Sequence, residues 1–317
     1  MKKYLYLLLP TLFLSFFTLL VACSKVDNLE LSIMPQSYFI VEEKYQGQDF
    51  ELEIFANLDK SFFSDIVQID EVYLKDKDES NVVKLDLKSI TKADSKIKIG
   101  AKKYHIFIFS FFINTNINSP EPLEIKEALI SLEYFNDETL ELEIGNFTYT
   151  RVSHIGTSDN DVSVNHILGL KNTINQIDTL AGVEIRIENR SSTVIKLNSV
   201  ESFDKNISFS LRNIVSPSSI DSPRKNVEEI LNKKYDFFIK ENPLILDYYI
   251  SPNEIFSFFV PIKYEKLYKT NKLPFKICFE KQGVNKEIIF DNFLFFRDFS
   301  LSTSEKSMIE RYFYDFN

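Results

Sequence analysis

Short segments in which apolar and polar residues alternate dominate this chain. Residues 50–54 (Phe-Glu-Leu-Glu-Ile) show the pattern most clearly. The same alternation recurs in residues 66–74, 82–87, 130–134 and 139–144. A period of two places one set of side chains in a core and the other in water, which predicts β-strands. Residues 106–113 are apolar almost throughout, which indicates a strand that is buried on both faces.

The second half of the chain repeats the first in outline. Three pairs of blocks match at spacings of 147, 145 and 146 residues: 109–113 with 256–260, 130–134 with 275–279, and 146–147 with 292–293. Residues 50–54 match residues 183–187 at a shorter spacing, so the second half holds extra residues between its blocks. Duplication of one unit explains this pattern, and so does chance similarity between two β-units.

Two segments depart from the strand pattern and predict helices. The first lies behind Ser222-Pro223, where apolar residues recur at helical spacing: Val227, Ile230, Leu231, Tyr235 and Phe238. The second begins with a capping box, Ser302 and Glu305, and continues with a stripe of Met308, Ile309, Tyr312 and Phe313. We expect the second helix to pack on the second unit. The alternative is an aromatic tail that docks a partner through Tyr312, Phe313 and Phe316.

The N-terminus has the composition of a secretory signal. Lys2 and Lys3 precede an apolar run of about 17 residues that ends at Leu20-Val21-Ala22-Cys23. These four residues resemble the lipobox of bacterial lipoproteins. The resemblance implies that Leu20, Val21 and Ala22 are recognised by a signal peptidase, that the chain is cut before Cys23, and that the Cys23 thiol carries a diacylglycerol. An uncleaved anchor helix with an incidental cysteine is the alternative.

The remainder of the chain predicts a mainly β protein of two tandem antiparallel β-sandwiches. About seven short strands per unit support this architecture. Each unit resembles an immunoglobulin-like or fibronectin-like domain in strand count and length, without the Trp and paired cysteines of true immunoglobulins, so the resemblance implies architecture only. The predicted segments are a signal peptide (1–22), a tether (23–29), a first sandwich (30–152), a linker (153–165), a second sandwich with an inserted helix (166–300) and a terminal helix (301–317).

The net charge and the cysteine content limit the classes of partner that the chain is expected to bind. The formal net charge is −9, and removal of Lys2 and Lys3 with the signal makes it −11. An acidic chain without a cluster of basic and aromatic residues predicts no nucleic-acid partner. Membrane lipid is therefore expected as a partner only through acylated Cys23. Cys278 has no disulfide partner in the mature chain and fits as a small filler on the less apolar face of a strand.

The sequence holds none of the usual catalytic or metal-binding motifs. The three histidines have no ligand at i+3 or i+4, and His105 is expected at a strand rim. His154 and His166 flank the predicted linker and, with Asp159 and Asp161, suggest either a site at the domain junction or a solvated linker. No calcium loop, serine-nucleophile motif or phosphate-binding glycine loop occurs. We therefore predict no enzymatic activity, no metal and no cofactor.

These observations favour a lipid-anchored, extracytoplasmic protein that binds or scaffolds an envelope protein through sheet edges, end loops or the terminal helix. Its location is the outer membrane or cell surface, or the outer face of the cytoplasmic membrane. One alternative is a hydrolase or substrate-binding component with a polar cleft near His154 and His166. Another is an outer-membrane subunit in which Phe107, Phe109 or Phe111 faces a partner.

Overall fold

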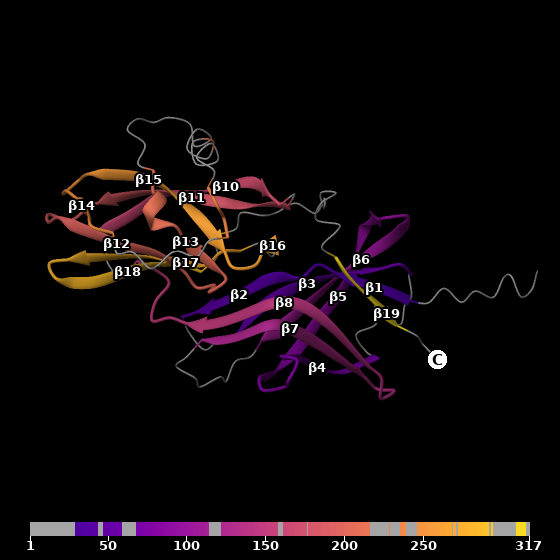
Figure 1. The fold of residues 1–317 in the computed structure, drawn as a ribbon. Helices are drawn as coiled ribbons and strands as arrows, with labels where there is room; N and C mark the ends of the chain where they lie inside the picture. The colour runs from indigo at the N-terminus through magenta and orange to yellow at the C-terminus, as the bar shows by residue number, and fades with distance from the viewer. Residues whose placement is uncertain are drawn as a thin grey trace, which may run out of the picture.

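The computed structural model describes residues 29–43, 47–58, 68–113, 122–157, 161–175, 177–215, 228, 235–238, 246–267, 269–270, 272–291, 293 and 309–314. These residues form two β-sandwiches joined in tandem, which we call sandwich 1 and sandwich 2 (Figure 1). Within these ranges, no helix has the length and apolar character needed to span a bilayer.

Sandwich 1 consists of two layers that share one long strand. Its strands are β1 (Leu29–Ile33), β2 (Gln36–Glu42), β3 (Gln48–Ala56), β4 (Ile69–Lys75), β5 (Val82–Ile99), β6 (Lys102–Ile113), β7 (Leu123–Tyr134), β8 (Thr139–Arg151) and β19 (Glu310–Tyr314). One layer has the order β19-β1-β3-β6-β5 and the other the order β5-β4-β7-β8-β2. The first residues of β5 pair with β4 and the later ones with β6, so β5 connects the layers.

The core of sandwich 1 lies between these layers and is rich in phenylalanine. Phe107, Phe109 and Phe111 of β6 are completely buried. The hypothesis that these side chains face a partner is therefore wrong, because they fill the interior instead. Ile108 and Phe112, on the opposite face of β6, are half-buried.

Sandwich 2 is built from two separate sheets. Its elements are β9 (Gly156–Thr157), β10 (Val162–Ile174), β11 (Ile177–Asn189), β12 (Ile195–Ser202), β13 (Ile207–Phe209), the short 3₁₀ helix η2 (Leu211–Asn213), β14 (Tyr248–Ile250), β15 (Ile255–Tyr264), β17 (Phe275–Lys281) and β18 (Val284–Phe290). One sheet has the order β10-β11-β15-β13 and the other the order β14-β12-β17-β18-β9. Buried side chains such as Phe258 and Ile277 form a second core that is distinct from the first.

Three of the four pairs of blocks that match in sequence occupy equivalent strands in the two sandwiches, while residues 292–293 follow the end of β18. The matched strands β6 and β15 pair with β3 and β11, which are themselves a matched pair. Likewise β7 lies between β4 and β8, as β17 lies between β12 and β18. The internal repeat therefore extends from sequence to strand pairing.

The prediction of a C-terminal helix is wrong for residues 310–314. They form β19, which pairs antiparallel with the whole of β1 in sandwich 1, from Leu29 opposite Tyr314 to Ile33 opposite Glu310. The apolar residues of this segment have helical spacing. The segment nevertheless forms a strand, because β1 provides an open edge and aromatic residues favour strands. Residues 301–308 and 315–317 lie outside the described residues. The predicted inserted helix lies mostly outside them too, but residues 235–238 are described and are not helical, so the prediction is wrong for Tyr235 and Phe238.

The predicted linker is shorter in the structure. Two of its segments belong to sandwich 2, because β9 pairs with β18 and β10 begins at Val162. On the other side, β8 ends at Arg151, one residue before the predicted end of the first sandwich. Leu29, the last residue of the predicted tether, is already the first residue of β1.

Candidate functional site

A short strand joins the two sandwiches. β16 (Lys269–Thr270) follows β15 in the chain and pairs in parallel with Gln36 and Ser37, at the start of β2. It therefore adds a strand from the sandwich 2 portion of the chain to the sheet of sandwich 1. This pairing places Ser37 at the junction of the two units.

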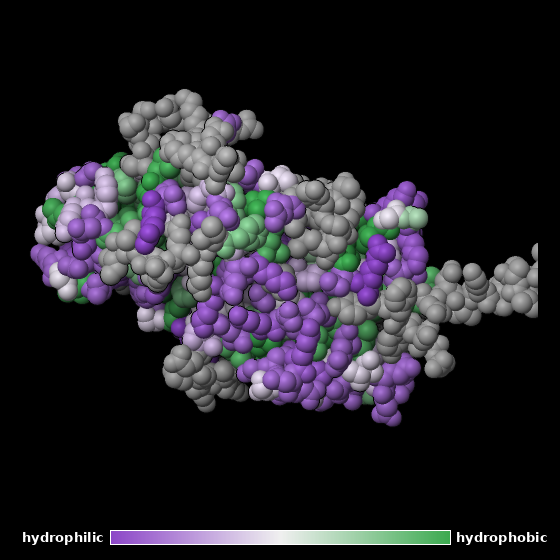
Figure 2. Space-filling model, in the orientation of Figure 1, coloured by the Kyte–Doolittle hydropathy of each residue, from purple (hydrophilic) through white to green (hydrophobic). Residues whose placement is uncertain are grey.

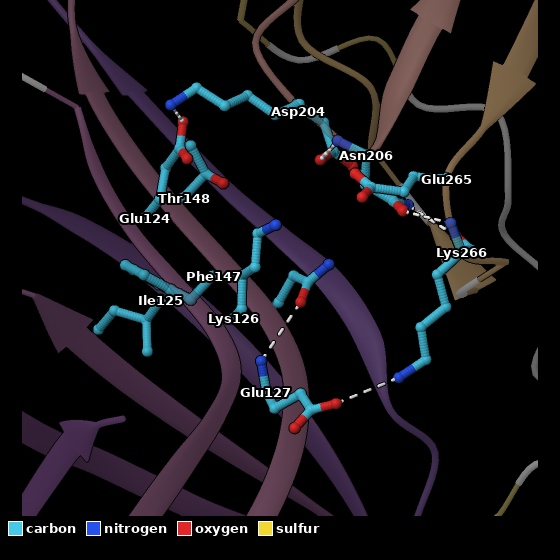
Figure 3. Close-up of a pocket in the computed structure, with 12 residues that line it drawn as sticks. Glu124, Ile125, Lys126, Glu127, Phe147, Thr148, Asp204, Asn206, Glu265 and Lys266 are labelled. Atoms are coloured by element: carbon cyan, nitrogen blue, oxygen red, sulfur yellow. Dashed lines mark hydrogen bonds and ion pairs between the residues drawn. The ribbon is translucent and has the colours of Figure 1, made fainter. Parts of the chain in front are cut away.

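A cleft of about 460 Å³ opens at the junction, and Figure 3 shows its two walls. Residues 124–127 of β7 and 146–148 of β8 form the sandwich 1 wall. Residues 204–206, which follow β12, and 265–266, which follow β15, form the sandwich 2 wall. This volume lies in the range of small-molecule sites, roughly 300–1,000 Å³. We call it the junction cleft.

A β-bulge in β7 supplies charges to the sandwich 1 wall. Lys126 and Glu127 of β7 stand opposite a single residue of β8, Asn146. Glu127 has a φ of +48°, and its N–H donates to Asn146 Oδ1 at 3.3 Å. Bulges re-aim side chains. At this bulge the Glu127 carboxylate points across the cleft, where Oε1 lies 3.4 Å from Lys266 Nζ.

Asn206 connects the two loops of the sandwich 2 wall. Its Oδ1 accepts the N–H of Lys266 at 2.6 Å, and its Nδ2 donates to the Lys266 carbonyl at 2.7 Å. Its backbone carbonyl accepts the N–H of Glu265 at 2.8 Å. Its own N–H donates to Asp204 Oδ1, also at 2.8 Å. One asparagine thus fixes the backbone around both Asp204 and Glu265.

Ion pairs cross the cleft at two places. Lys205 Nζ lies 2.8 Å from Glu124 Oε1, and Lys266 Nζ reaches Glu127. Glu127 also binds Lys77 at 3.1 Å, and the two lysines hold the pKa of Glu127 below its usual value. Because the lysines are exposed, each pair contributes about 0–1 kcal/mol. These ion pairs therefore orient the two walls but add little to the stability of the junction.

Asp204 is the buried acid of the junction cleft. Asp204 is only 4% exposed. Its Oδ2 makes no hydrogen bond of ordinary geometry with the described residues. Burial raises the pKa of Asp204 to about 6, and the charges of Glu124 and Glu265 add to the rise. The Asn206 N–H and the Ser37 hydroxyl act in the opposite direction. Like Asp204 Oδ2, the buried Ser37 hydroxyl has no ordinary hydrogen bond.

The residues predicted for lipidation and docking are mostly outside the described part of the chain. Cys23 and its neighbours Leu20, Val21 and Ala22 lie there, and so does Phe316. The backbones of Tyr312 and Phe313 belong to β19, paired with β1.

None of the three histidines lines the junction cleft. His154 contacts Ser153 Oγ at 3.1 Å and the Glu287 carbonyl at 3.3 Å, while His166 is exposed on β10. The rim position predicted for His105 is also wrong. His105 is buried because the later part of β5 covers the start of β6, where its ring lies 6.5 Å from Phe107.

The remaining candidates have structural contacts. Asp161 forms ion pairs with Lys281 and Lys286, and Asp159 lies outside the described residues. Cys278 is half-buried on β17 with its Sγ 3.7 Å from Glu201 Oε1, and burial raises the pKa of its thiol. The described ranges contain no group of three His, Cys, Asp or Glu side chains that could hold a metal.

Sequence reasoning missed the junction cleft. Its walls come from four segments that are distant in the chain, and a bulge has no local signature. One signal was present, because the turn-forming residues Ser202, Asp204 and Asn206 lie close together between two predicted strands.

No protein-family model matches this chain, and no curated protein matches it. Several solved structures are similar over most of their length. A protein of unknown function from Porphyromonas gingivalis W83 has a TM-score of 0.21 and 9% identity, covering 83% of this chain and 97% of that one. A chicken TCR has a TM-score of 0.18 and 9% identity, covering 82% and 99%. The titin segment A168–A169 has a TM-score of 0.15 and 6% identity, covering 82% and 98%. The assignment of two β-sandwiches rests on the strand order described above.

Proposed function

We propose that this protein is a lipid-anchored component of a bacterial cell envelope that presents sandwich 2 to a binding partner. The main support for this proposal is the position of β1. β1 begins at Leu29, so residues 24–28 alone separate it from Cys23. At about 3.5 Å per residue, the tether spans roughly 20 Å at most. β1 lies at the end of sandwich 1 that points away from sandwich 2 (Figure 1). A lipid on Cys23 would therefore hold sandwich 1 at the bilayer and sandwich 2 farther out.

Exposed apolar side chains on sandwich 2 support a partner-binding role. Five large ones belong to β14, begin β15 or β18, or directly precede β12: Val194, Tyr248, Tyr249, Ile255 and Val284. Tyr249 is 58% exposed, while the ring of Tyr248 stacks on Phe256 at 3.9 Å. β14 lies at the far end of sandwich 2 from β1 (Figure 1), and apolar residues are visible on this end in Figure 2. Exposed aromatic residues are common at protein interfaces.

The lipid anchor is tested by replacing Cys23. The Cys23→Ala variant should lose all incorporation of radioactive palmitate and should leave the membrane fraction or retain its signal peptide. Cys278→Ser is the matched control, because Cys278 is the only other cysteine, and it should label like the wild type. Unchanged labelling of Cys23→Ala would refute the anchor.

The partner is tested by crosslinking in intact cells, with the Cys23→Ala form for comparison. One stoichiometric envelope protein recovered with the wild type supports the proposal. Replacement of Tyr249 by serine should reduce that recovery several-fold, because the exposed ring is lost. Recovery of no partner at all would count against a scaffolding role.

The junction cleft favours a second candidate function, the binding of a small charged ligand. Its walls carry both carboxylates and lysines, which suit a ligand with charged groups. Calorimetric titration with L-lysine and L-glutamate probes cationic and anionic ligands separately. Binding that weakens at least tenfold in Glu265→Ala would support this candidate, and no heat with either probe would contradict it for these two classes.

A further inference from the structure

We propose that the junction between the two sandwiches is a proton-responsive joint: when the carboxylates of the junction cleft take up a proton, the sandwiches are drawn together, and when they release it the contact loosens. The joint requires neither the lipid anchor nor a partner, so it stands apart from the function proposed above.

Carboxylates from both sandwiches converge on Asp204. Glu124 approaches from β7 of sandwich 1, and Glu265 belongs to the neighbouring loop of sandwich 2; both act on Asp204 through their charge. Glu124 is balanced by its ion pair with Lys205. Among the described residues, Asp204 itself forms no ion pair with a lysine or arginine. Its charge is therefore buried without a direct counter-charge, which is an unfavourable arrangement.

The other groups that face Asp204 come from every element packed against it. They are Glu124 of β7, Ser37 of β2, Tyr264 at the end of β15, Glu265 in the loop after β15, and Lys205 and Asn206 of its own loop. Three further charged side chains line the same cleft: Lys126, Glu127 and Lys266. Glu127 and Lys266 are paired with each other. The groups that interact directly with Asp204 thus include two carboxylates and two buried hydroxyls, those of Ser37 and Tyr264.

A proton on Asp204 changes the junction in two ways. It removes the repulsion between Asp204 and Glu124, which belong to different sandwiches. It also removes a charge that is buried without a direct counter-charge. The Ser37 hydroxyl of sandwich 1 stabilises the ionised carboxylate and so acts the other way, but burial is the largest cause of the raised pKa and outweighs it. The net effect of the proton is to favour the docked arrangement.

The direction of the pH dependence follows from the pKa of Asp204. The value is about 6 in the docked structure and 3.8 for a solvated aspartate. The docked form therefore holds the proton more tightly than a form in which Asp204 is solvated. The proton-dependent stabilisation is fully present below pH 3.8 and is lost as the pH rises through about 6. Linkage gives a docking equilibrium about tenfold more favourable at pH 5 than at pH 8.

Hydrogen exchange of the full chain, purified in detergent micelles, tests the joint. Protection factors, corrected for the intrinsic rate at each pH, are measured for the backbone amides of β16 and of the start of β2. In the wild type we expect about tenfold higher protection at pH 5 than at pH 8. Asp204→Asn should be protected at both pH values, because the amide is neutral. Glu265→Gln should move the midpoint to lower pH, because one like charge is removed.

The matched control is Asp86→Asn, which changes an exposed aspartate of β5 outside the cleft and should keep the wild-type profile. Equal protection of the wild type at pH 5 and pH 8 would overturn the proposal. It would also be overturned if Asp204→Asn kept the full pH dependence. Should Asp204→Asn fail to fold, Glu265→Gln decides: a shifted midpoint supports the joint, and an unshifted one refutes it.

Discussion

Replacement of Gly145 by alanine should destabilise sandwich 1 by more than about 2 kcal/mol and detach β2 from β8. Gly145 has a φ of +104°, a conformation that strains residues with a side chain by about 1–3 kcal/mol. A Cβ at this position would lie 2.3 Å from the carbonyl oxygen of Gln36 and 2.6 Å from its nitrogen. Both are backbone atoms, so the clash is relieved only if β2 moves away.

Gly283→Ala is the matched control for this substitution. Gly283 also has a positive φ, +78°, but nothing lies within 4 Å of the added Cβ. Gly283→Ala should therefore lower the free energy of unfolding by only about 1 kcal/mol, which is the conformational cost alone. Urea unfolding measures both losses, and hydrogen exchange of β2 shows whether the strand has detached. Equal losses in the two variants would contradict a close contact between β8 and β2.

Truncation of a core phenylalanine should be the most damaging single change in either sandwich. Phe111 and Phe258 occupy matched positions in the repeat, and both are completely buried. Phe111 packs 5.3 Å from Phe50, and Phe258 packs 5.2 Å from Phe256, measured between ring centroids. Replacement of either by alanine leaves a cavity, which typically costs about 3–5 kcal/mol.

The two substitutions should destabilise different sandwiches. Each phenylalanine belongs to its own core cluster, so Phe111→Ala should lower the unfolding midpoint of sandwich 1 and Phe258→Ala that of sandwich 2. Phe135→Ala serves as the control, because Phe135 is 66% exposed and its loss should cost less than about 0.5 kcal/mol. A single transition that moves equally in both variants would contradict independent cores.

The strand framework could be predicted from the sequence because each strand carries its own period. Residues 50–54 alternate in burial within β3 as the pattern indicates, and three of the four matched pairs of blocks fall on equivalent strands. Cys278 occupies the less buried face of β17, as predicted. These features depend on side chains a few positions apart, where local pattern and burial agree.

The features that were missed all depend on contacts between distant parts of the chain. Residues 310–314 have helical spacing, but their pairing with β1 decides their conformation. His105 is buried because β5 continues well beyond the stretch that alternates in sequence. The junction cleft depends on Glu124, Asp204 and Glu265 coming together, and nothing near any one of them in the sequence indicates the other two.

The pairing of β19 with β1 has a consequence for biogenesis. β19 follows every strand of sandwich 2 in the chain, so β1 emerges from the ribosome long before its outer neighbour exists. Until then β1 has an open edge that is able to pair with other chains. Sandwich 1 can complete its sheet only after sandwich 2 has been synthesised, and contacts of such long sequence separation form slowly. We therefore expect the newly synthesised chain to depend on a holding chaperone until residues 310–314 reach β1.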